Sequence, residues 1–210
     1  MRMATQPDSG GSPALGVYIA QRARAAAEAV ARQIAYPLVT PNFLTVLGFI
    51  LTVGVAAVIA SGWEQLGGVL VLLVGLFDLL DGAMARVRGL KTRFGAFLDS
   101  TLDRMSEAVL LGGVLWLHHD DPVYGPWYPI LTLAVLTGSL LVSYTRARAE
   151  GLEPRVECEV GWLPRPQRVI LLAAGLITGL TFEALVLLAV LTNVTTVQRI
   201  LHVRRSLAGR

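Results

Sequence analysis

Six long apolar runs dominate the chain and limit what it can fold into. They fall at about residues 43–61, 65–85, 94–117, 127–149, 166–181 and 182–202. At about 1.5 Å per residue, a helix of roughly 20 apolar residues crosses a hydrocarbon core about 30 Å thick. Hydrophobic residues make up 54% of the sequence, which also lies outside the range of soluble domains. The sequence therefore predicts an all-α fold, an integral membrane bundle of six transmembrane helices.

Short helix-start and helix-stop signals separate these runs. Thr40 followed by Pro41 is typical of a helix start, with an N-cap residue and a proline in the first turn. The break Gly179-Leu180-Thr181 divides the last apolar block into two predicted spans.

All 18 Lys and Arg residues lie on or near one side of the predicted bundle. With an even number of spans, the N-terminal segment, the 86–93 loop, the 146–168 segment and the C-terminus share that side. Short loops rich in Lys and Arg stay in the cytoplasm. Tryptophans flank the loops of the opposite side, as expected for rings at a membrane interface. We therefore expect a multi-pass plasma-membrane protein with both termini in the cytoplasm.

The first 37 residues differ from the rest of the chain. Residues 1–13 are rich in Gly, Ser and Pro and are expected to form a disordered tail. Residues 14–37 place arginines among alanines, with apolar residues on roughly one face. This pattern predicts an N-terminal amphipathic juxtamembrane helix on the cytoplasmic membrane surface, with a solvent-exposed bundle helix as the alternative. Residues 38–205 form the expected six-helix domain.

Four aspartates interrupt the second and third apolar runs. Each would cost a few kcal/mol or more if it faced lipid. Asp78 and Asp81 are three residues apart, and Asp99 and Asp103 are four apart. Each pair therefore projects from one face of its own helix. Because the turn between the two helices is short, we expect the four carboxylates to converge near the cytoplasmic ends of the spans.

Converging carboxylates suit a hard cation such as Mg²⁺ or Mn²⁺. Two such ions about 3.5 to 4 Å apart can orient phosphates and stabilise an in-line displacement. The alternatives are structural ion pairs with Arg86 and Arg104, or an ion-conducting path. Small residues, including Gly82 and Ala85, leave room for a ligand beside the acids, although close helix packing would also explain them.

The segment from Asp78 to Asp103 resembles the signature of the CDP-alcohol phosphotransferase family, D(x)2DG(x)2AR(x)8G(x)3D(x)3D. Every fixed position matches: Asp78, Asp81, Gly82, Ala85, Arg86, Gly95, Asp99 and Asp103. The six-span bundle also fits the family, and the resemblance covers roughly residues 38–205. It implies a Mg²⁺-dependent membrane enzyme that moves a phosphoalcohol group from a CDP-linked donor to an alcohol, and it implies a homodimer.

The resemblance also implies roles for individual residues. Asp78, Asp81 and Asp99 would hold two Mg²⁺ ions, or Mn²⁺, with Asp103 as a shared ligand. Asp103 would chiefly act as the general base for the acceptor hydroxyl, whose oxygen attacks the β-phosphorus of the donor and expels CMP. The residues expected to contact the CDP donor are Asn42, Gly82, Ala85, Arg86 and Gly95.

Basic residues outside the signature narrow the choice of acceptor alcohol. Arg146, Arg168 and Arg199 lie at the cytoplasmic ends of three different spans. They resemble the acceptor pocket of the inositol-phosphate-using members, where they would bind the phosphate of inositol 1-phosphate. Snorkelling side chains that only set the topology are the alternative, and Arg165 fits either group.

The sequence thus predicts a phospholipid-synthesis enzyme with a CDP-lipid donor, either CDP-diacylglycerol or CDP-archaeol, and inositol 1-phosphate as acceptor. Two alternatives stay open at this point. The first is the same chemistry with glycerol 3-phosphate as acceptor, and the second is a divalent-cation transporter. Membrane lipids are expected partners, and nucleic acid is not.

Overall fold

The computed structural model describes residues 29, 40–87, 89, 92–152, 158 and 160–208, without the side chains of residues 79–82 and 85. The expected tail, residues 1–13, and the expected amphipathic helix, residues 14–37, lie outside this part apart from Ala29. In this described part, six α-helices follow one another: α2 (Pro41–Ala60), α3 (Glu64–Val87), α4 (Arg93–His118), α5 (Tyr128–Leu152), α6 (Arg165–Thr178) and α7 (Thr181–Ala208). The described ranges contain no strand, which confirms the all-α prediction.

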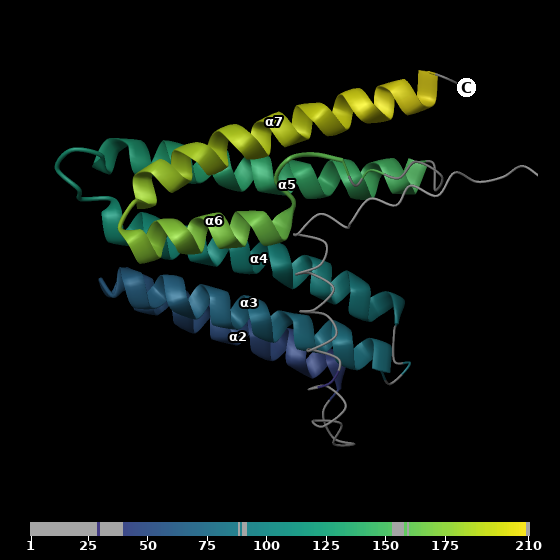
Figure 1. Ribbon diagram of the computed structural model, residues 1–210, viewed down its shortest axis with the longest axis horizontal. Helices are drawn as coiled ribbons and strands as arrows, with labels where there is room; N and C mark the ends of the chain where they lie inside the picture. The colour runs from purple at the N-terminus through teal and green to yellow at the C-terminus, as the bar shows by residue number, and fades with distance from the viewer. Residues whose placement is uncertain are drawn as a thin grey trace, which may run out of the picture.

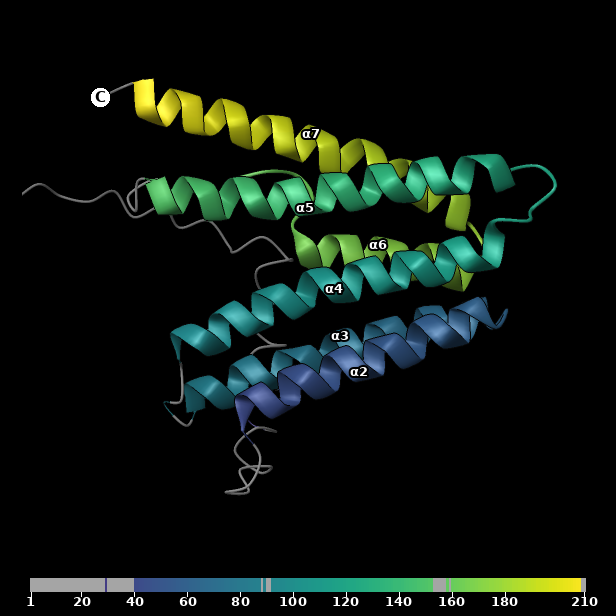
Figure 2. The same ribbon diagram turned by 180° about the vertical axis from the view of Figure 1, so that it is seen from behind.

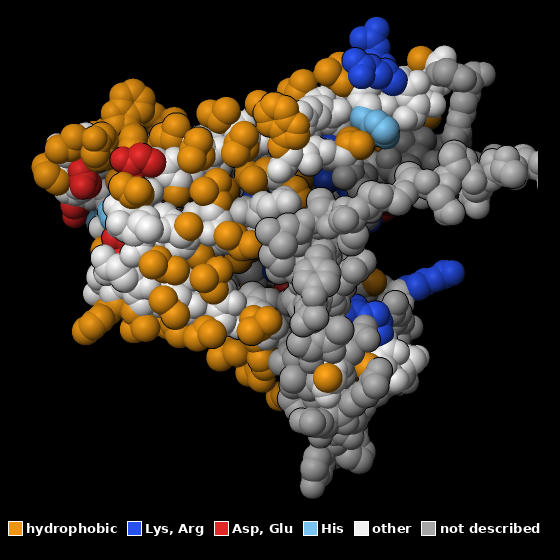
Figure 3. All heavy atoms as spheres, in the orientation of Figure 1, with side chains coloured by type: hydrophobic (Ala, Val, Ile, Leu, Met, Phe, Trp, Pro, Cys, Tyr) orange, Lys and Arg blue, Asp and Glu red, His pale blue; other side chains and the backbone are white. Residues whose placement is uncertain are grey.

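The six helices run side by side along the long axis of the molecule (Figures 1 and 2). Helix α2 packs against both α3 and α4, and α5 packs against α7. Helix α6 contacts α3 on one side and α7 on the other, so it lies between these two helices. The start of α2, the α3–α4 turn and the end of α7 lie at the same end of the bundle (Figure 1). We call this end the basic end, because Arg side chains gather there in Figure 3.

Large apolar side chains both fill the bundle and cover its outer surface. The interior contains fully buried residues, among them Ile59, Leu111, Val114, Leu176 and Leu185. Other large apolar residues are exposed, among them Ile50, Leu73, Leu133 and Val190. Figure 3 shows such side chains spread along the sides of the bundle. A surface of this kind is stable in lipid, and it identifies the fold as a helical membrane bundle.

Three of the helical segments are long and apolar enough to cross a membrane by length and composition alone: Pro41–Ala60, Gly125–Leu152 and Thr181–Ala208. Helices α3 and α4 have 24 and 26 residues, but they carry the predicted acids. Helix α6 has only 14 residues, about 21 Å at the usual rise, so it is shorter than the expected span 166–181. It ends at Thr178 because Gly179 adopts a left-handed conformation with φ 73°.

The predicted start of the first span is confirmed. Thr40 caps α2 by accepting a hydrogen bond from the backbone N–H of Phe43 at 3.2 Å, and Pro41 occupies the first helical position. This cap fixes the first turn of α2, which contains Asn42, at the basic end of the bundle. Thr92 caps α4 in the same way, accepting from the N–H of Gly95 at 2.9 Å.

The contact between α2 and α4 depends on a glycine. A Cβ atom added at Gly113 would lie 2.6 Å from the carbonyl oxygen of Ala56, whereas one added at neighbouring Gly112 would meet nothing within 4 Å. We expect Gly113→Ala to destabilise the protein by about 1–3 kcal/mol, because the backbones must move apart. Gly112→Ala should be neutral or slightly stabilising, because alanine favours a helix. Unfolding of both variants in mixed micelles checks this, and equal stabilities would contradict it.

Candidate active site

Three of the four predicted aspartates lie together near the basic end. Asp78 comes from α3, and Asp99 and Asp103 come from successive turns of α4. One carboxylate oxygen of each residue lies within 4.8 Å of the other two, and all three side chains are partly buried. The side chain of Asp81, the fourth predicted member, lies outside the described part of the chain. The short α3–α4 turn and the four-residue spacing on α4 therefore bring acids from two helices into one cluster.

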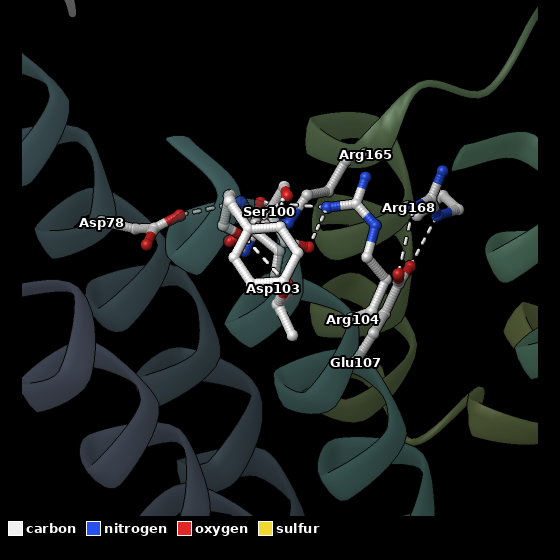
Figure 4. A network of polar contacts seen from close by, with 9 residues as sticks. Asp78, Ser100, Asp103, Arg104, Glu107, Arg165 and Arg168 are labelled. Atoms are coloured by element: carbon white, nitrogen blue, oxygen red, sulfur yellow. Dashed lines mark hydrogen bonds and ion pairs between the residues drawn. The ribbon is translucent and has the colours of Figure 1, made fainter. Parts of the chain in front are cut away.

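An arginine from a third helix bridges this cluster. Arg165, the first residue of α6, places Nη1 2.8 Å from Oδ2 of Asp78 and Nη2 2.7 Å from Oδ1 of Asp103. Figure 4 shows these contacts between the three helices. Arg104 lies further off, with Nη1 3.8 Å from Oδ2 of Asp103, and it donates a hydrogen bond to the carbonyl oxygen of Ser100. The positive charge offsets the mutual repulsion of the carboxylates.

A second ion pair lies one turn further along α4. The Nε and Nη2 atoms of Arg168 lie 2.5 and 3.0 Å from the two carboxylate oxygens of Glu107 (Figure 4). Arg168 also donates from Nη1 to the carbonyl oxygen of Leu163 at 3.3 Å. The side chains of Arg168 and Glu107 are only 3% and 11% exposed. Such a buried two-point pair fixes the guanidinium plane.

A cavity of about 60 Å³ lies beside both ion pairs. Charged side chains line part of it: Asp78, Asp103, Glu107, Arg165 and Arg168. Thr45, Thr52 and Ser106 add hydroxyl groups, and residues such as Val55, Leu111 and Leu188 line it within the bundle. The cavity therefore offers a small anionic polyol both hydrogen-bond donors and hydrogen-bond acceptors next to the carboxylate cluster.

Two of the residues predicted to contact the donor lie next to each other. A Cβ atom at Gly95 would come within 3.0 Å of Oδ1 of Asn42 and 2.9 Å of Oγ1 of Thr92. A side chain at position 95 would therefore displace the side-chain oxygens of Asn42 and Thr92. Arg86 is exposed in the last turn of α3. The side-chain surroundings of Gly82 and Ala85 lie outside the described part of α3.

The three arginines predicted for the acceptor phosphate have different surroundings. Arg168 lines the cavity, whereas Arg146 and Arg199 are not among its described lining residues. Arg146 is exposed on α5 and pairs with Glu150 at 2.8 Å. Arg199, on α7, is 5% exposed and donates to the carbonyl oxygens of Val160, at 2.9 Å, and Val142. A phosphate-binding role for these three stays a prediction.

Sequence reasoning did not assign two of the charged residues in this region: it gave Glu107 no role, and it left Arg165 between the acceptor pocket and the arginines that only set the topology. Glu107 follows Asp103 by four residues, so the spacing already placed it on the same face of α4 as Asp99 and Asp103. Arg165 precedes Arg168 by three residues, which likewise puts both on one face of α6. Local sequence patterns do not indicate that this face of α6 packs against α3, because the contact between Arg165 and Asp78 joins residues 87 positions apart.

The cluster of three carboxylates fits a hard divalent cation. Carboxylate oxygens are the ligands that Mg²⁺ and Mn²⁺ prefer, and three carboxylates within 4.8 Å are close enough to share one or more ions. The same acids lie beside arginines that suit phosphate groups. Fold and site together thus define a helical membrane protein with an acidic site at the basic end of its bundle.

The family follows from comparison with known sequences. The family model described as CDP-alcohol phosphatidyltransferase matches residues 38–200, so the chain belongs to this family. This membership makes the protein a transferase, and it favours that function over the cation transporter that the aspartates alone left open.

Individual relatives agree with this family. The archaetidylinositol phosphate synthase of Methanothermobacter thermautotrophicus is 38% identical over 83% of this chain and 86% of its own length. The phosphatidylinositol phosphate synthase of Mycobacteroides abscessus is 37% identical over 80% of this chain and 78% of its own.

Solved structures of the phosphatidylinositol phosphate synthase of Mycobacterium tuberculosis are also similar, at 35% identity. The crystal structure with CDP-DAG bound gives a TM-score of 0.76 over 84% of this chain and 92% of that one. The complex with manganese and citrate also gives 0.76, over 84% of this chain and 88% of that one. These relatives support the use of a divalent metal by the family.

Proposed function

We propose that this enzyme transfers a phosphatidyl-type group from a CDP-lipid, CDP-diacylglycerol or CDP-archaeol, to inositol 1-phosphate and releases CMP. The observation that carries the proposal is the convergence of Asp78, Asp99 and Asp103 beside a cavity that also contains Arg165 and Arg168. Relatives named as inositol phosphate lipid synthases match most of the chain and support the same acceptor. The site lies toward one end of the helices, where a soluble nucleotide and lipid tails can both reach it.

Asp78, Asp81, Asp99 and Asp103 are the proposed ligands of two Mg²⁺ ions, which Mn²⁺ can replace. Bound there, divalent cations neutralise phosphate charge and favour an in-line displacement. The three described carboxylates support this assignment by their closeness. For Asp81, the support is its position three residues after Asp78 on the same helix.

Asp103 is the proposed general base. It lines the cavity, so an acceptor hydroxyl held there can come within reach of its carboxylate. Asp103 accepts the proton from that hydroxyl as the acceptor oxygen forms a bond to the β-phosphorus of the donor. The bond from this phosphorus to the bridging oxygen breaks, and CMP leaves with that oxygen.

The donor nucleotide is proposed to bind at the starts of α2 and α4 and the end of α3. The adjacency of Asn42 and Gly95 supports this assignment, because a contact with one places a ligand beside the other. Gly82, Ala85 and Arg86 complete the proposed set from the last turns of α3.

The acceptor phosphate is proposed to bind arginines, with Arg168 as the central one. Its pair with Glu107 holds the guanidinium against the cavity, and a guanidinium has more N–H donors than the observed contacts use. Arg146 and Arg199, from α5 and α7, complete the proposed acceptor set.

The active site is proposed to face the cytoplasm from the plasma membrane, with both chain ends on the same side. The gathering of Arg side chains at the basic end supports this orientation (Figure 3). Residues 1–13 remain a proposed tail, residues 14–37 a proposed surface helix and residues 38–205 the proposed catalytic domain. A homodimer is proposed from family membership.

The proposal is tested by supplying purified protein with CDP-diacylglycerol, Mg²⁺ and one acceptor at a time. We expect CMP release with inositol 1-phosphate at a rate at least about tenfold above that with glycerol 3-phosphate or free inositol, because the site offers arginines to a phosphate and hydroxyls to a polyol. Chelation of divalent cations should abolish this release. Product from glycerol 3-phosphate and none from inositol 1-phosphate would reject the proposed acceptor.

A further inference from the structure

Arg165 contacts carboxylate oxygens of two of the three acids in the carboxylate cluster. Its two terminal nitrogens lie 2.8 Å from Oδ2 of Asp78 and 2.7 Å from Oδ1 of Asp103. These acids come from α3 and α4, and Arg165 comes from α6, so one guanidinium links three helices (Figure 4). The contacts have the short, charge-assisted geometry of strong hydrogen bonds.

A divalent cation and this guanidinium exclude each other from the same position. Each contacted oxygen already directs one of its two lone pairs at an N–H of Arg165. A cation bound at about 2.0–2.1 Å from these oxygens would have to share them with the guanidinium. The two positive charges would also repel each other strongly in a partly buried site. This repulsion favours the loss of at least one of the two contacts when a cation binds.

In its bridging position, Arg165 leaves one of its hydrogen-bond donors without an acceptor in the described part of the chain. Its Nε–H is buried and has no acceptor among the residues that the structure describes. An unmet donor of this kind carries a desolvation cost that the two carboxylate contacts must outweigh. Arg165 also lines the cavity that contains Glu107 and the hydroxyl of Ser106. A guanidinium released from the aspartates has acceptors available within the same cavity.

We propose that Arg165 is an internal competitor for the metal site, which neutralises Asp78 and Asp103 before a divalent cation binds and is displaced when it does. This inference rests on the proposed function, because it takes the carboxylate cluster as the metal site. It makes Arg165 a positioning residue that lowers the affinity for metal. A residue that merely braced the metal ligands would raise that affinity instead.

Arg104 provides a matched control. It carries the same charge beside the same acid, but its Nη1 lies 3.8 Å from Oδ2 of Asp103. In the described part of the chain its polar contacts are with Asp103 and Ser100 and not with Asp78. Its removal changes the local charge without vacating the position between Asp78 and Asp103. Arg165→Lys is a second variant, since lysine keeps the charge but cannot reach two carboxylates as a planar fork.

The experiment titrates the full-length protein in detergent with Mn²⁺ and follows the electron paramagnetic resonance signal of the free ion. We expect Arg165→Gln to bind Mn²⁺ about tenfold or more tightly than the wild type, Arg165→Lys to lie between them, and Arg104→Gln to stay within about threefold of wild type. In thermal melts without divalent cation, Arg165→Gln should have a lower melting temperature than the wild type. Adding Mn²⁺ should raise the melting temperature of Arg165→Gln by more than it raises that of the wild type.

The outcomes separate this inference from the proposed function. Unchanged or weaker Mn²⁺ binding by both Arg165 variants would overturn the competition while leaving the metal site in place. An equal gain in Arg104→Gln would also overturn it, because general charge would then explain the effect. If the wild type and every variant bind no Mn²⁺, the proposed metal site and this inference fail together.

Discussion

Replacing Asp103 by asparagine should reduce CMP release by about 10²–10⁴-fold, the usual contribution of a general base. Asparagine has nearly the same shape and retains an oxygen for Arg165, which lies 2.7 Å from Oδ1 of Asp103. The bundle should therefore still fold. The loss has two sources, because the amide cannot accept the proton of the acceptor hydroxyl and is a poorer ligand for a divalent cation. The rate is measured with CDP-diacylglycerol, inositol 1-phosphate and saturating Mg²⁺.

Asp120→Asn is the control for this experiment. Asp120 lies in the loop between α4 and α5, at the end of the bundle opposite the aspartate cluster, and its side chain is 88% exposed. The substitution removes one carboxylate from the same chain, so the rate should be unchanged. Near-wild-type activity of Asp103→Asn, in protein that has kept its fold, would remove Asp103 from the reaction.

Replacing Glu107 by alanine should destabilise the protein more than replacing Gly113 or Glu150 by alanine. The change leaves the Arg168 guanidinium, 3% exposed, without its carboxylate partner inside the bundle. Breaking one side of a buried ion pair costs about 3–5 kcal/mol, because an uncompensated charge remains buried. The free energy of unfolding, measured in mixed micelles, should fall by that amount. Acceptor binding should also weaken, because Arg168 loses the contact that holds it against the cavity.

Two comparisons separate the stability of this pair from its function. Glu150→Ala removes the partner of Arg146 in a pair whose side chains are 45–46% exposed, and it should cost only about 0–1 kcal/mol. The double variant Glu107→Leu with Arg168→Met should regain most of the lost stability, since apolar residues can replace a buried pair. It should remain inactive. If the double variant is as active as the wild type, Arg168 does not bind the acceptor.

The parts of the fold that depend on local sequence could be predicted. Apolar runs gave the six helices, and the cap at Thr40 and the break at Gly179 gave two of their boundaries. The spacing within α3 and α4 also placed Asp78, Asp99 and Asp103 on facing surfaces, since a short turn joins these two helices. Local sequence suffices there because periodicity and short connections determine which side chains share a face.

The parts that depend on distant contacts could not be predicted. Arg165 joins the aspartates only because α6 packs against α3, and no local signal reports which helices of a bundle are neighbours. The positive-inside pattern explained every arginine at the basic end equally well, so it did not separate buried Arg168 from exposed Arg146. Their difference comes from which face of each helix meets the interior.

Whether the carboxylate cluster binds divalent cations is tested most directly by an anomalous difference map from crystals of the full-length protein loaded with Mn²⁺. We expect peaks among the carboxylates of Asp78, Asp99 and Asp103, with Arg165 moved off at least one of the aspartates. Anomalous peaks only elsewhere, for example at the acidic loop between α4 and α5, in protein that still releases CMP, would contradict this expectation.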